Sequence, residues 1–114
     1  MSRIMATLES KDTDYVVSRL VSVGFMLSNP DSGLITGFNE QGDQIVFDTL
    51  QVAIEFLAPD HCLQLWQSSD QDLSVTRAID GRISVHFDGY SETDTRALLE
   101  QLVTNGLPHS AQLE

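Results

Sequence analysis

Cysteine is almost absent from this sequence, which contains only Cys62. One cysteine cannot form an intramolecular disulfide, and it cannot build a structural zinc site, because such sites use several cysteine or histidine ligands. The three histidines, His61, His86 and His109, show no metal-ligand spacing either. We therefore expect no metal and no cofactor, and a reducing, cytoplasmic location.

Long apolar runs and catalytic motifs are also missing. No stretch approaches the roughly 20 apolar residues that span a membrane, and residues 1–9 lack the apolar core of a signal peptide. There is no phosphate-binding glycine loop, nucleotide fingerprint or nucleophile elbow. Asp60, His61 and Cys62 place a base beside a nucleophile, but neighbouring residues of a strand point to opposite faces. We expect a protein that is not an enzyme, has no catalytic residues and does not insert into membranes.

Basic residues are few, and they are unevenly spread. Lys11 is the only lysine, and the formal net charge is -11. Between Arg19 and Arg77 there is no lysine or arginine. Contacts to phosphate need Lys and Arg, so direct binding to nucleic acid or to anionic lipid is disfavoured. The acids either attract a basic protein partner or only keep the domain dispersed. The base-free stretch contains eight acids: Asp31, Glu40, Asp43, Asp48, Glu55, Asp60, Asp70 and Asp72.

What the sequence does contain fits one small folded domain. It has 114 residues, of which 41% are hydrophobic, so a core can form without disulfides. Residues 113–114 are Leu-Glu, a pair typical of a cloning scar. We assign residues 1–112 to a single α+β domain and leave the last two residues out of the fold.

Two helices are indicated near the ends of the chain. Residues 13–23 have an apolar face at helical spacing, with Asp12 or Thr13 as the N-cap and Gly24 as the stop. Residues 92–104 have a similar face, and Ser91 is suited to cap them. Residues 105–108, Asn-Gly-Leu-Pro, form a strong stop signal.

Strands are indicated between the helices. Residues 34–38 and 44–48 are typical of a hairpin across 39–43, residues 25–28 fit a short strand, and residues 2–9 fit a strand or a helical turn. For 73–77 and 83–87, a three-residue loop over 79–81 pairs Val75 with Val85 and Leu73 with Phe87. That loop places Gly81 at a left-handed position, which glycine tolerates.

Residues 50–57 fit two structures. Leu50, Ala53, Ile54 and Leu57 fit a helix face, yet residues 51–56 alternate polar and apolar as a strand does. A four-residue loop over 58–61 would set Ile54 opposite Leu65, and Phe56 opposite Leu63, on one face of a sheet. We therefore predict a strand here.

The predicted architecture is an antiparallel, mostly meandering sheet of five or six strands, packed by an N-terminal and a C-terminal helix. The helices should cover the face carrying Ile54, Phe56, Leu63, Leu65, Val75, Val85 and Phe87. The other face should remain in water and carry Glu55, Gln64, Trp66, Thr76, Ser84 and His86.

Trp66 on that open face is the candidate anchor for a partner. Together with Glu55, Gln64, Asp48, Asp70 and Asp72 it would form an apolar centre within an acidic rim. In the alternative, a chain terminus or a loop covers Trp66. We predict a non-enzymatic acidic protein that holds a basic protein, of the immunity-protein or nucleic-acid-mimic type. Both a monomer and a homodimer remain open.

Two other functions remain as alternatives. Residues 38–66, FNEQGDQIVFDTLQVAIEFLAPDHCLQLW, resemble the central sheet of type III secretion chaperones. The resemblance implies a dimeric chaperone or adaptor, although the dimerisation helix of that family is missing, because only residues 67–72 precede the next strand. A small-molecule sensor is the third possibility, with Arg77 facing a pocket between sheet and helices.

Overall fold

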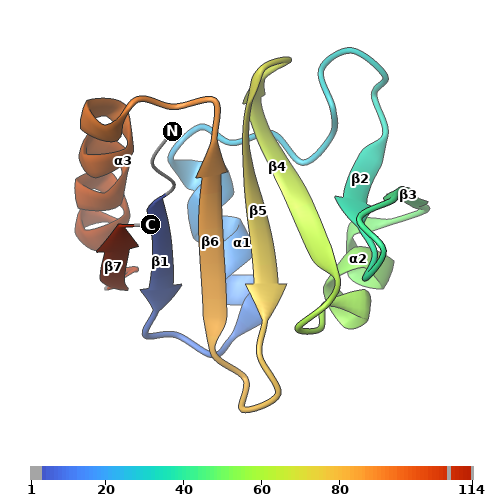
Figure 1. Ribbon diagram of the computed structural model, residues 1–114, viewed down its shortest axis with the longest axis horizontal. Helices are drawn as coiled ribbons and strands as arrows, with labels where there is room; N and C mark the ends of the chain where they lie inside the picture. The colour runs from blue at the N-terminus through green and yellow to red at the C-terminus, as the bar shows by residue number, and fades with distance from the viewer. Residues whose placement is uncertain (1–3, 108, 114) are drawn as a thin grey trace.

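The computed structural model describes residues 4–107 and 109–113 and shows seven antiparallel strands and three helices in them (Figure 1). The strands lie in the order β3-β2-β4-β5-β6-β1-β7. Only β4, β5 and β6 form a meander, because β2 separates β3 from β4. The strands are β1 (Ile4–Leu8), β2 (Ile35–Phe38), β3 (Gln44–Phe47), β4 (Cys62–Ser68), β5 (Gln71–Arg77), β6 (Ile83–Asp88) and β7 (His109–Leu113).

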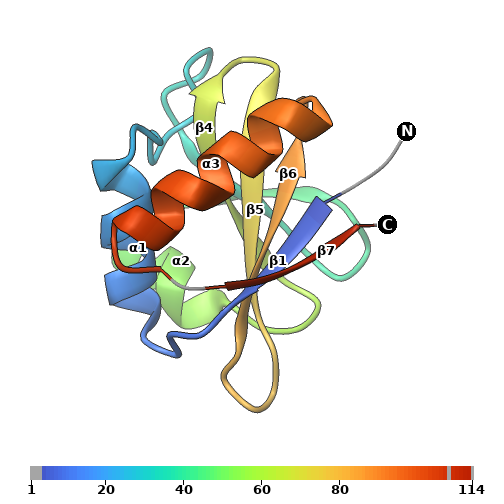
Figure 2. The same cartoon turned by 90° about the vertical axis from the view of Figure 1, so that its left-hand side faces the viewer.

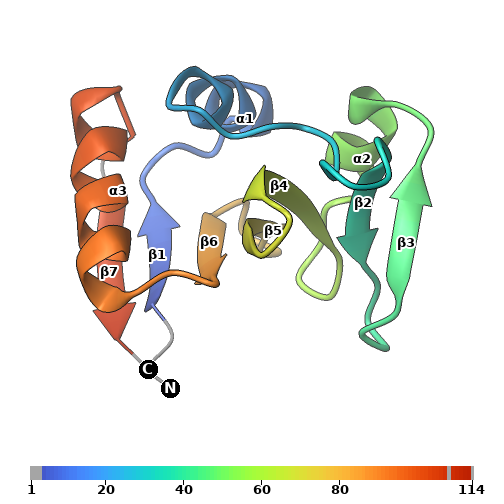
Figure 3. The same ribbon diagram turned by 90° about the horizontal axis from the view of Figure 1, so that it is seen from above.

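The helices are α1 (Thr13–Ser22), α2 (Leu50–Phe56) and α3 (Glu92–Thr104). Figure 3 shows α1 and α2 on one side of the sheet, and Figures 1 and 2 show α3 at its β1–β7 end. Apolar side chains of all three helices join one core with the strands. The α+β class with an antiparallel sheet is confirmed. The packing by two terminal helices is confirmed only in part, because α2 also covers the sheet. The most deeply buried strand residues are Ala6, Leu63, Leu65, Leu73, Val75, Ile83 and Val85.

Local signals for the helices agree with the structure. The Asp12 side chain accepts a hydrogen bond from the Tyr15 amide at the start of α1, and Ser91 accepts one from the Asp94 amide at the start of α3. These bonds satisfy backbone donors that the first helical turn leaves free. The expected bounds of α1 and α3 therefore agree with the observed ones within one residue.

The β5–β6 hairpin has the register expected from its side chains. Leu73 pairs with Phe87, and Val75 pairs with Val85. Gly81 in the connection has a φ of +91°, so the left-handed residue lies where the three-residue loop places it. The same register aligns the polar residues of β5 with those of β6 on the opposite face.

Residues 50–57 correct the prediction of a strand, because they form α2 and its C-cap. The Thr49 hydroxyl accepts a hydrogen bond from the Val52 amide and caps the helix. Ala53 and Ile54 face the core, whereas Phe56 is 49% exposed. The neighbour of β4 is instead β2, in which Gly37 pairs with Leu63. At Gly37 a Cβ would collide with the Cys62 carbonyl, so glycine permits this close pairing.

Other differences concern the ends and the edges. Residues 25–28 form no strand, and only Met26 bridges to Trp66. Residues 4–8 form β1, and β7, which the sequence did not indicate, pairs with it. Leu113, assigned to a cloning scar, lies in β7 opposite Ile4.

The segment that resembles secretion chaperones contains α2 where a strand was predicted. No helix of the described ranges is long and apolar enough to cross a membrane.

Candidate functional site

The six residues proposed to bind a partner do not form one exposed face. Glu55 lies on α2, while Asp48 and Asp70 are exposed in connections outside the strands. Gln64 and Asp72 share the helix-free face of the sheet with Trp66, but both are buried, with 4% and 8% exposed. The expectation of a single acidic rim around a tryptophan is therefore wrong in its geometry.

Trp66 is buried, which agrees with the alternative in which it is covered and not with an exposed anchor. Only 6% of the residue is exposed. Its backbone exchanges two hydrogen bonds with Met26, in the segment that joins α1 to β2. The indole Nε1 is buried and has no hydrogen-bond partner among the described residues. Trp66 is therefore a packing residue in this conformation and not a free anchor.

A pocket lies on the helix-free face of β4, β5 and β6, which faces the viewer in Figure 1. Its volume is about 420 Å³, within the range of roughly 300–1,000 Å³ that is usual for ligand pockets. Because strand neighbours point to opposite faces, its polar side chains alternate with the leucines and valines of the core. The polar lining consists of Cys62, Gln64, Asp72, Ser74, Thr76, His86 and Asp88, and Phe38 and Phe87 complete it.

A hydrogen-bonded network fixes one side of this pocket. The Gln64 amide nitrogen donates to Asp72 Oδ2 at 2.9 Å, and the Thr36 hydroxyl donates to Gln64 Oε1 at 3.0 Å. Gln44 Nε2 lies 3.4 Å from the same Gln64 oxygen. The bonds from Gln64 and Thr36 are buried, where an unmade bond is costly, whereas Gln44 is exposed. Gln64 thus orients the Asp72 carboxylate.

Two carboxylates face each other across strands at the pocket. Asp72 in β5 is the register partner of Asp88 in β6. Burial raises the pKa of Asp72 above its usual range, and the Asp88 charge raises it further, against the lowering effect of the Gln64 hydrogen bond. Burial, together with the Asp72 charge, also raises the pKa of Tyr90. The region is therefore electrostatically negative and only partly solvated.

The pocket does not assemble an activated nucleophile from its thiol. Burial is the main cause that raises the pKa of Cys62, so the neutral thiol is favoured over the reactive thiolate. Within residues 4–107 and 109–113, no cluster of three histidine, cysteine or acidic side chains is arranged to hold a metal.

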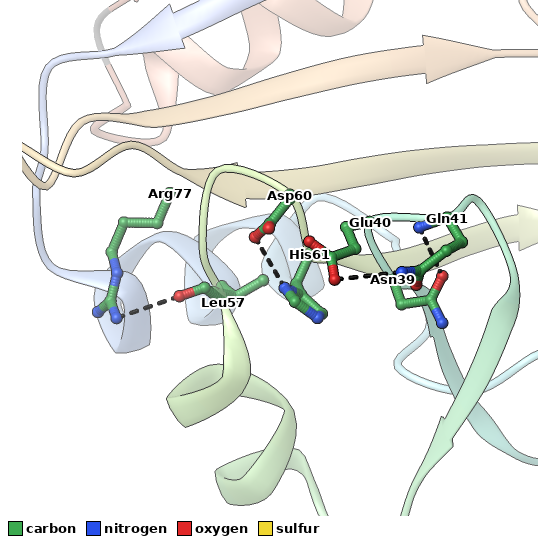
Figure 4. Close-up of polar contacts among 7 residues, drawn as sticks. All are labelled: Asn39, Glu40, Gln41, Leu57, Asp60, His61 and Arg77. Atoms are coloured by element: carbon green, nitrogen blue, oxygen red, sulfur yellow. Dashed lines mark hydrogen bonds and ion pairs between the residues drawn. The ribbon is translucent and has the colours of Figure 1, made fainter.

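The neighbouring His61 interacts outside the pocket lining. His61 Nδ1 lies 2.9 Å from Asp60 Oδ1, and this contact lowers the pKa of the Asp60 carboxyl (Figure 4). The His61 ring also meets Phe56 edge to face, with centroids 4.7 Å apart. His61 therefore contacts Asp60 and Phe56, whereas Cys62 lines the pocket.

Arg77 has a structural partner. Its Nη2 donates to the Leu57 carbonyl at 3.2 Å and ties the end of β5 to the C-cap of α2 (Figure 4). This contact engages the guanidinium that the sensor alternative assigned to a ligand. The pocket lies on the other face of the sheet from the one that this alternative proposed.

The sequence analysis missed Ser74 and Phe38 in the pocket lining, and it also did not single out Asp88. The signal was present, because pairing Leu73 with Phe87 in an antiparallel register also pairs Asp72 with Asp88. Thr76 and His86, expected on the open face, do line the pocket. No family model, curated protein or solved structure matches this chain.

Proposed function

We propose that this protein is a non-enzymatic binding protein that holds a basic protein partner. The observation that carries the proposal is where the fold places the base-free stretch of sequence. Residues 20–76 supply β3, β2 and β4, which are adjacent in the sheet, together with α2 and all of the next strand, β5, except its last residue, Arg77. We name this part the acidic half. It contains no lysine or arginine, and seven of its eight acids are exposed, since only Asp72 is buried.

Apolar side chains are exposed among these acids. Met26, Leu34, Val46, Val52 and Phe56 all lie in the acidic half and are exposed. Interfaces combine apolar contacts, which supply affinity, with charged rims, which steer the encounter and select the partner. A surface of this composition suits a partner with exposed lysine and arginine around an apolar centre. The lysine and arginine residues outside residues 20–76 would repel such a basic partner, so that part of the surface is less suitable for binding it.

The proposal is tested with two variants that remove equal charge. One carries Glu40→Gln, Asp43→Asn, Asp48→Asn and Glu55→Gln in the acidic half. The matched control carries Glu9→Gln, Asp14→Asn, Asp94→Asn and Glu100→Gln, four exposed acids of the other half. Each variant and the unmodified protein are immobilised, native lysate is applied at low and high salt, and retained proteins are identified by mass spectrometry.

We expect a basic protein to be retained by the unmodified chain and by the control. The acidic-half variant should lose it, and high salt should release it, because exposed charges are screened beyond about 10 Å at 0.1 M salt. Equal retention by both variants, or retention that does not depend on salt, would contradict the proposal.

A further inference from the structure

The paired carboxylates of the helix-free pocket are an unusual feature of the sheet. Like charges placed directly opposite one another on adjacent strands destabilise the pair. Asp72 and Asp88 occupy such positions, and Asp72 is more than nine-tenths buried. A sheet selected for stability alone would place a polar neutral or an apolar pair there. Local rules of this kind are most often broken at functional sites.

We propose that this pocket binds an organic cation, the guanidinium of an arginine or the ammonium of a lysine side chain, between Asp72 and Asp88. The cation would neutralise the repulsion between the two carboxylates. Relief of this repulsion would add to the free energy of binding. No lysine or arginine lines the pocket to play this part. Where the cation belongs to a protein, this inference rests on the proposed function and names how that partner is held.

The hydrogen-bonding pattern leaves acceptors for such a cation. Gln64 donates to Asp72 Oδ2, so the second carboxylate oxygen, Oδ1, takes no part in this bond. The hydroxyls of Ser74 and Thr76 also line the pocket. Carboxylate oxygens and hydroxyls match the several N–H donors of a guanidinium or an ammonium. Phe38 adds an aromatic surface against which the alkyl part of such a side chain packs.

A metal ion fits the same site less well. Calcium takes six to eight oxygen ligands, often several of them carboxylates, and magnesium keeps several waters beside one or two carboxylates. The pocket offers two carboxylates, and no metal-competent cluster of three occurs in the described part of the chain. Its volume of about 420 Å³ instead suits a side chain or a small organic molecule. An organic cation is therefore the ligand class that the pocket favours.

The test uses the full chain and the probe N-acetyl-arginine methylamide, which carries one guanidinium and no other charge. Backbone amide shifts are followed by NMR at about pH 8, where the guanidinium of the probe is cationic. The same titration is made with the uncharged N-acetyl-norleucine methylamide, with calcium chloride, and with n-butylguanidine as a free, singly charged small-molecule cation. The variants are Asp72→Asn, Asp88→Asn and, as a matched control, Asp70→Asn, which removes an exposed acid outside the pocket.

We expect the arginine probe to shift amides of residues 62–66, 72–76 and 84–88. Its dissociation constant should rise by about tenfold or more in Asp72→Asn and in Asp88→Asn, and remain unchanged in Asp70→Asn. Because Asp88 is exposed, Asp88→Asn keeps the test valid if Asp72→Asn does not fold. Tighter binding of n-butylguanidine than of the arginine probe would support the pocket and indicate that its ligand is a free small cation and not a protein side chain.

Three results would overturn the inference. The first is that the norleucine probe binds as tightly as the arginine probe. The second is that calcium binds more tightly than either organic cation. The third is that the arginine probe shifts no amides in these strands. The four-charge variants leave the pocket intact, so they separate this inference from the proposed function. Suppose that the acidic-half variant loses the basic partner, while Asp72→Asn and Asp88→Asn do not change the affinity for the arginine probe. That result would contradict the inference about the pocket and leave the proposed function supported.

Discussion

The two faces of strands β4, β5 and β6 are built from alternate residues of the same segments, yet they differ in polarity and in charge. One face carries Leu63, Leu65, Leu73, Val75, Ile83 and Val85, all fully buried in the core with the helices. The other carries a hydrogen-bonded network and two opposed carboxylates around a pocket. Burial of the first face stabilises the fold. On the second face, the two opposed carboxylates repel each other, and we infer that their pocket binds a ligand.

The largest expected effect is on the helix-covered face. Leu65→Ala removes a fully buried side chain and leaves a cavity, so we expect the free energy of unfolding to fall by about 2–5 kcal/mol. Thr76→Ala, a half-buried position on the other face of the next strand, should cost less than about 1 kcal/mol. Urea unfolding of both variants measures the difference. Equal losses would show that the two faces contribute alike and would contradict the comparison.

A smaller loss is expected from the polar network. Gln64→Leu keeps most of the volume but leaves Asp72 Oδ2 and the Thr36 hydroxyl without this partner, at a cost of about 1–3 kcal/mol. Gln44→Leu makes the same chemical change at an exposed position and should cost less than about 0.5 kcal/mol. Unfolding by urea again gives the comparison. If Gln64→Leu were as stable as Gln44→Leu, the network would not support the pocket.

The smallest effect has the opposite sign and depends on pH. Because burial raises the pKa of Asp72, the folded state binds that proton more tightly than the unfolded chain does. Stability is therefore lost as pH rises from the ordinary carboxyl range through the raised pKa of Asp72, and the full loss is present above that raised pKa. Asp72→Asn has no such proton to lose. We expect its melting temperature to exceed that of the unmodified protein by a few degrees at pH 7.

Melting curves at a series of pH values down to about pH 4 test this expectation. The advantage of Asp72→Asn should shrink as pH falls, because the unmodified carboxyl then becomes protonated in the folded state. Asp70→Asn, at an exposed acid, is the control and should show no comparable advantage. An advantage of Asp72→Asn that is the same at every pH would show that the buried charge is not its origin. Greater stability combined with weaker cation binding would mark Asp72 as a functional residue.

Much of the fold could be predicted because its signals are local. Asp12 and Ser91 cap the helices that they precede in the sequence, and Gly81 sets the register of the β5–β6 hairpin within a short loop. The same register places Thr76 and His86 in the pocket. The candidate site was harder to predict, since burial of Gln64 and Asp72 depends on neighbours from β2 and β6.

Residues 50–57 show why alternation was not sufficient. Leu50, Ala53, Ile54 and Leu57 fit a helical period, while residues 51–56 also alternate in a plausible strand register. The choice depends on which segment pairs with β4, and β2 occupies that edge with Gly37 opposite Leu63. Trp66 is a similar case, because Met26, forty residues earlier, pairs with its backbone. Neither neighbour can be identified from the segment itself.

The sequence by itself determined the charge pattern, the two capped helices, the hairpins and the identity of the alternating apolar residues. These follow from interactions within a few residues of one another, which the order of amino acids fixes. Only the tertiary structure decided that 50–56 is a helix, that Trp66 is covered, and that Asp72 and Asp88 meet in a pocket. Those outcomes depend on which distant segments lie side by side, and the free energy of such contacts belongs to the whole fold and not to any one segment.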